Sequence, residues 1–111
     1  MRLERSMWAA GVAAGILASA SLARADAVED GKKLVEAKKC SICHAVDGKG
    51  GRKEMKPLNG ITEGKTDEWL LDAMKDPKKT IGPDTKMPSY KDKLTDDEIK
   101  AVIAYLKTLK K

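Results

Sequence analysis

The sequence predicts an all-α fold of three main helices joined by long loops. Three segments, near residues 27–38, 67–75 and 96–111, place apolar side chains three and four positions apart, which is the period of a helix. No stretch of useful length alternates apolar and polar residues, as a half-buried strand does. The connections are long for so small a chain, and such loops are hard to justify without a ligand to wrap.

Residues 1–25 have the pattern of a secretory signal peptide. Two arginines give a basic start, an apolar run follows, and Ala23 and Ala25 supply the small residues that a signal peptidase reads. This pattern predicts export to the periplasm, with cleavage before Asp26 and one mature domain, residues 26–111. The apolar run is short for a membrane span, so we expect none after cleavage, and an uncleaved anchor is the alternative.

The first predicted mature helix covers residues 27–38, with Leu34 and Val35 on its apolar side. The second begins at Thr66, a good N-cap, and carries two acidic residues in its first turn. It is expected to stop at Asp76, because the residue before a proline is pushed out of the helical region. The segment 78–86 then reads as a loop.

The last helix has the clearest pattern. Thr95 and Glu98 form a capping box, and apolar residues recur at spacings of three and four from Ile99 to Leu109. Tyr105 lies on the flank of this stripe. Lysines at its end, up to Lys111, are expected in the last turn, where positive charge suits the helix dipole.

A Cys-x-x-Cys-His run at residues 40–44 predicts the attachment site of a covalently bound c-type haem. The thiols of Cys40 and Cys43 can each add across a porphyrin vinyl group, and His44 is then carried toward the iron. A structural zinc site needs four Cys or His ligands, and the chain has two cysteines and one histidine. A thioredoxin-like couple needs a βαβ context, which is missing, and a plain disulfide is the remaining alternative.

Composition agrees with a small cofactor-centred domain. The mature segment keeps 19 Lys and Arg against 16 Asp and Glu, a net charge near +3. That excess is too mild to indicate nucleic-acid binding, and no basic stretch is interleaved with aromatic residues. Chains of this size bury only ~60–65% of their unfolded surface. Since this chain has no Phe, one haem would complete a thin core.

The residue on the other face of the iron decides between electron transfer and ligand binding. With no second histidine, the candidates are Met, Lys, Tyr, a terminal amine, water or an open position. Met55 lies in a Gly- and Lys-rich loop that positions it poorly, and mid-helix Met74 is expected in the core. Met87 precedes Pro88, which restricts its backbone and gives its sulfur a fixed aim. We therefore expect Met87 on the iron, where a thioether raises the reduction potential.

These residues resemble the small single-haem class I cytochromes c of the short bacterial periplasmic type, over essentially the whole mature chain. The resemblance implies that Cys40 and Cys43 are the thioether residues and that His44 and Met87 are the axial ligands. The implied fold wraps three helices and long loops around one covalently attached haem c. It also implies that Gly31, in the first helix, lies where the C-terminal helix crosses.

The chain departs from the family pattern at two places. The family usually has an aromatic residue four positions before the first cysteine, and this chain has Glu36 there. The family's Pro-x-Leu-x-Gly turn supplies a proline carbonyl to the haem-ligating imidazole. Leu58 and Gly60 match that turn, but Lys56 takes the proline's position and Pro57 follows, so either carbonyl is a candidate partner of His44.

The expected function is one-electron transfer between redox partners in the periplasm, without enzymatic activity. A basic rim is expected to dock partners with acidic surfaces. One alternative is the haem c subunit of a dedicated oxidoreductase complex, and another is a ligand-binding or sensing haem protein with an open or labile sixth position. The rim residues are Lys38, Lys39, Lys49, Arg52, Lys53, Lys86, Lys91 and Lys93.

Overall fold

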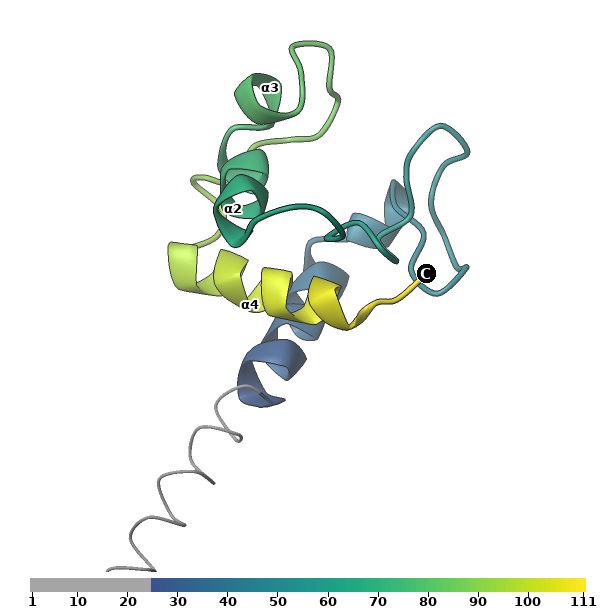
Figure 1. Cartoon of the computed structure of the whole chain (residues 1–111), viewed down its shortest axis with the longest axis vertical. Helices are drawn as coiled ribbons and strands as arrows, with labels where there is room; N and C mark the ends of the chain where they lie inside the picture. Colours follow the sequence, from purple (N-terminus) through teal and green to yellow (C-terminus); the bar gives the residue numbers. More distant parts are fainter. Residues whose placement is uncertain (1–24) are drawn as a thin grey trace, which may run out of the picture.

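The computed structural model describes residues 25–111, which form helices, turns and loops and contain no strand (Figure 1). The predicted all-α fold with three main helices is confirmed. The predicted signal peptide lies outside the described residues except for Ala25. Among the helices described, none has the length and apolar character to cross a membrane. The elements are the first helix (helical over residues 25–37), the 3-10 helix η1 (Cys40–Ile42), α2 (Asp67–Lys75), α3 (Pro77–Thr80) and α4 (Asp96–Thr108).

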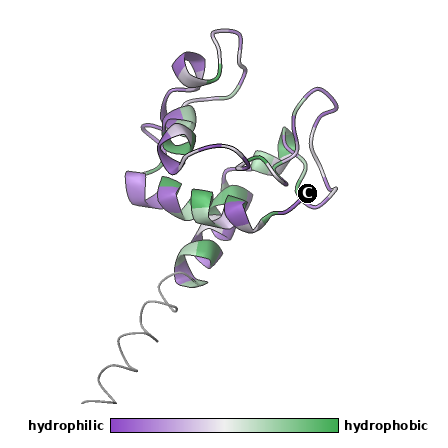
Figure 2. Ribbon diagram, in the orientation of Figure 1, coloured by the Kyte–Doolittle hydropathy of each residue, from purple (hydrophilic) through white to green (hydrophobic). Residues whose placement is uncertain are grey.

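The core lies where α4 crosses the first helix and packs under α2 (Figure 1). Ile99 of α4 is fully buried, and Val35 of the first helix and Leu70 of α2 pack in the same cluster. Figure 2 shows that each of these helices has hydrophobic and hydrophilic sides. The remaining core residues are Leu58, Ala73, Met74, Leu94, Val102, Ile103, Tyr105, Leu106 and Leu109.

Gly31 marks the closest approach of the first helix to α4. A Cβ built on Gly31 would lie 2.0 Å from the carbonyl oxygen of Ala101 and 2.9 Å from the Cβ of Tyr105. Only a residue without a side chain fits there. The crossing that the resemblance implied is therefore present, and Tyr105 is buried against the first helix.

Side-chain caps set the starts of the helices as predicted, and one cap adds a helix that we did not predict. The Thr66 hydroxyl accepts the backbone N–H of Trp69 at 3.0 Å at the start of α2. Asp76 ends α2, but its carboxylate then accepts the N–H of Lys79 at 3.3 Å and caps α3. The prediction of a loop at 78–86 was therefore wrong at its start, because Pro77 suits the first position of a helix.

The C-terminal end of α4 differs from the prediction. The capping box of Thr95 and Glu98 is confirmed at its start, but the helix ends at Thr108, so Lys110 and Lys111 lie beyond it. The Leu109 carbonyl accepts the backbone N–H of Gly60 at 2.8 Å. This long-range hydrogen bond pulls the last residues out of the helix and onto the turn at residues 58–60.

Candidate functional site

One tight turn carries both cysteines and the histidine of the motif. The first helix gives way to a turn in which Lys39 has a left-handed backbone (φ 56°), and η1 follows at once. The N–H groups of Cys43 and His44 both donate to the Cys40 carbonyl, at 3.2 and 3.0 Å. Because residues three apart eclipse each other in a 3-10 turn, Cys40 and Cys43 lie on the same side.

The imidazole of His44 is oriented by a backbone carbonyl. Its Nδ1 lies 2.7 Å from the carbonyl oxygen of Lys56, which answers the question that the displaced Pro57 left open. Because a carbonyl oxygen only accepts hydrogen bonds, the imidazole carries its proton on Nδ1. Its Nε2 lone pair is then available to a metal, which is the usual way in which a second partner sets the tautomer of a His ligand.

The turn that supplies this carbonyl is tied to two other parts of the chain. The Asn59 amide exchanges two hydrogen bonds with Asp47, both 2.8 Å long, and donates a third to the Lys110 carbonyl at 2.9 Å. Next to it, the Gly60 N–H donates to the Leu109 carbonyl. The C-terminal tail therefore helps to hold the turn at residues 56–60 in place.

The two thiols are free and half-buried. Burial raises the pKa of the Cys40 thiol, a backbone hydrogen bond lowers it in part, and Cys43 nearby raises it further. A raised pKa keeps the Cys40 thiol protonated at ordinary pH. Two free thiols on one side of a turn, followed by an imidazole with a free Nε2, are the donor set that a covalently attached haem requires, so these residues fit that group.

Met87 lies in the loop between α3 and α4, half-buried, and packs against the core cluster. Cys40 packs against the same cluster, so the two ends of the candidate site share one core. The loop of Met87 and the loop after His44 rise on the same side of α4 (Figure 1). The Met87 backbone N–H donates to the Thr85 hydroxyl at 3.4 Å.

The other candidates for the sixth ligand occupy different environments. Met74 is buried in the core on α2, as predicted. Met55 is half-buried in the loop after the motif. Trp69 packs against the core, and the Lys65 ammonium lies 4.5 Å from its ring centroid.

Sequence reasoning missed two residues that come after the Met-Pro pair. Tyr90 is half-buried, and burial raises the pKa of its hydroxyl, with added contributions from Cys40 and Cys43. Tyr90 therefore lies within electrostatic reach of both thiols. Ser89 donates its hydroxyl to the Lys75 carbonyl at 2.6 Å. An aromatic residue and a hydroxyl just after Met87-Pro88 were the available signals.

The basic residues that were expected to form a rim are all exposed. Within residues 25–111, none of these eight side chains takes part in an ion pair, whereas Lys75, Lys107 and Lys111 do. The Lys93 ammonium lies 5.7 Å from the ring centroid of Tyr90. The rim charges are therefore not neutralised by acidic side chains of the described chain.

Comparison with known proteins gives two matches. A family model described as cytochrome c matches residues 28–110. The chain is also similar to cytochrome c2 from Rhodospirillum rubrum, with 33% identity over 138 aligned positions that cover 97% of this chain and 100% of the relative. No solved structure matches the chain.

Proposed function

The chain belongs to the cytochrome c family and is an electron carrier rather than an enzyme, and we propose that it shuttles single electrons in the periplasm. Membership and the single Cys-x-x-Cys-His motif imply one covalent haem c. In the proposal Cys40 and Cys43 are the thioether residues, and His44 and Met87 are the axial ligands. The observation that carries it is the 2.7 Å bond that fixes His44 with Nε2 free.

The residues of the chain have separable roles in this proposal. When bound, the haem supplies an iron that alternates between Fe(II) and Fe(III). His44 is held by the Lys56 carbonyl and does not need to turn between these states. The Met87 thioether favours Fe(II) and so raises the potential. With His44 and Met87 as the two ligands, little rearrangement would accompany electron exchange, and no position on the iron would be left for a substrate.

Carbon monoxide and a redox titration test the proposal together. We expect the reduced holoprotein to bind carbon monoxide poorly, because Met87 holds the sixth position, and to titrate as one reversible one-electron couple. Both measurements use absorption spectroscopy of the purified holoprotein. Rapid, stoichiometric carbon monoxide binding would instead favour a ligand-binding or sensing protein. Co-purification of a stable larger partner would favour a subunit of a dedicated oxidoreductase complex.

The exposed basic rim predicts partners with acidic docking surfaces. Oxidation by the anion hexacyanoferrate(III) is expected to slow by about tenfold or more from low to high salt, because screening removes the attraction. Oxidation by a cationic cobalt complex should speed up instead. Stopped-flow kinetics would measure both rates.

A pair of charge reversals is the matched control for the rim. Lys86→Glu and Lys33→Glu change the net charge equally, but Lys33 is exposed on the first helix, outside the rim. Lys86→Glu should reduce the salt dependence with hexacyanoferrate(III) more than Lys33→Glu. Equal effects would mean that overall charge, and not this rim, steers the encounter.

A further inference from the structure

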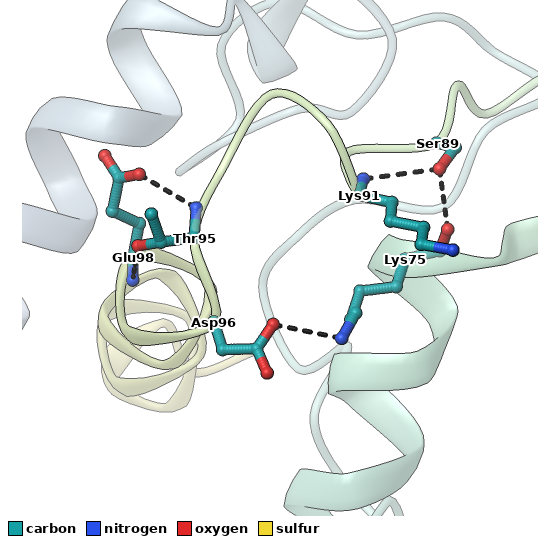
Figure 3. A network of polar contacts seen from close by, with 6 residues as sticks. All are labelled: Lys75, Ser89, Lys91, Thr95, Asp96 and Glu98. Carbon is teal, nitrogen blue, oxygen red and sulfur yellow. Dashed lines mark hydrogen bonds and ion pairs between the residues drawn. The ribbon is translucent and has the colours of Figure 1, made fainter.

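The segment just after Met87 and Pro88 is fastened to the C-terminal end of α2 (Figure 3). The Ser89 hydroxyl donates to the Lys75 carbonyl at 2.6 Å and accepts the backbone N–H of Lys91 at 3.3 Å. One residue on, the Tyr90 backbone N–H donates to the Met74 carbonyl at 2.8 Å. Two successive carbonyls of α2 thus receive donors from the loop of the proposed axial ligand.

These bonds follow from how α2 ends. The last carbonyls of a helix have no partner within the helix and must find donors elsewhere. α2 stops at Lys75, and the chain then turns into α3 at Pro77. The loop therefore supplies donors to the last carbonyls of α2. The same hydrogen bonds fix the position of the loop directly after Met87.

Lys75, whose carbonyl accepts the Ser89 hydrogen bond, is also tied to α4 through its side chain. The Lys75 ammonium lies 3.0 Å from the carboxylate of Asp96, the first residue of α4 (Figure 3). The capping box of Thr95 and Glu98 secures that end of α4. Ser89 therefore joins the loop to a point where two main helices meet, and it belongs to neither of those helices.

We propose that Ser89 is a positioning residue that holds the Met87 loop closed, so that its bond to Lys75 limits how readily Met87 leaves the iron. This inference rests on the proposed function, in which Met87 is an axial ligand. In the parent protein the loop can open only if the Ser89 hydrogen bond breaks. In Ser89→Ala that bond is missing, so opening costs less free energy. The strength of an ordinary hydrogen bond corresponds to an increase of about five- to tenfold in the open fraction.

Displacement of Met87 by imidazole measures that fraction. In a titration of the ferric holoprotein, the sulfur-to-iron charge-transfer band of Ser89→Ala should disappear at about five- to tenfold lower imidazole concentration than in the parent. Ser89→Thr keeps the hydroxyl and should behave like the parent. Hydrogen exchange of the Tyr90 amide is a second readout, detected without the haem absorption, and it should quicken by a similar factor in Ser89→Ala.

Thr108 offers a matched control. Its hydroxyl donates to the Tyr105 carbonyl at 2.6 Å, the same kind of bond at the end of α4. Thr108→Val should leave the imidazole titration unchanged, and an equal shift would overturn the proposal in favour of a general loss of stability. If Ser89→Ala shows the band and loses it at the same imidazole concentration as the parent, the proposed role of Ser89 is overturned and the ligation by Met87 stands. Absence of the band from the parent would overturn both the ligation by Met87 and the proposed role of Ser89.

Discussion

Met87→Ala is expected to abolish the sulfur-to-iron charge-transfer band of the oxidised holoprotein and to lower its reduction potential. Loss of the thioether removes the ligand that favours Fe(II), and axial ligands set haem potentials over a range of about 0.8 V, so a fall of about 0.1 V or more is expected. The reduced variant should also bind carbon monoxide readily. Absorption spectra and a potentiometric titration would record all three changes.

Two other methionines provide controls for Met87. Met74→Leu nearly conserves volume in the core, and Met55→Ala alters a half-buried loop residue. Both variants should keep the band and a potential close to that of the parent. A band that survives in Met87→Ala but is lost in Met55→Ala would assign the sixth position to Met55 and overturn the assignment of Met87.

Local chemistry explains which parts of the fold were predictable. Thr66 and Thr95 act through their own neighbours three residues on, so the starts of α2 and α4 follow from sequence. The helix at Pro77 escapes the sequence prediction because the same proline that stops one helix suits the first position of the next, and Asp76 both ends α2 and caps α3. The end of α4 was not predictable, because a contact with Gly60, far away in the chain, sets it.

The candidate site divides in the same way. The motif places Cys40, Cys43 and His44 on one turn through spacing alone, and the structure agrees. The carbonyl that orients His44 is that of Lys56, at the position where the family has its proline, and not that of Pro57. Any residue at that position offers a backbone carbonyl, so the proline itself is not needed. The Ser89 hydroxyl follows the Met-Pro pair in the sequence, but which donor reaches the end of α2 depends on how the folded loop returns to that helix.

Gly31→Ala is expected to destabilise the holoprotein by about 2 kcal/mol or more, although alanine favours helices by about 1 kcal/mol over glycine. The new Cβ would lie 2.0 Å from the Ala101 carbonyl oxygen, and backbone cannot rotate away as a side chain can. The first helix and α4 would have to separate, and overpacking of this kind costs typically about 1–3 kcal/mol and sometimes more. Denaturant unfolding followed by haem absorbance would measure the loss.

Gly64→Ala separates this contact from the conformational effect of replacing a glycine. Gly64 has a φ of +72° and nothing within 4 Å of a built Cβ, so its substitution should cost only the strain of a left-handed residue, roughly 1–2 kcal/mol. Gly31 is helical, so its cost comes from the crossing alone. Because that crossing also buries Tyr105, Gly31→Ala should speed exchange of amides in both helices. A Gly31→Ala protein as stable as the parent would show that the helices do not approach so closely.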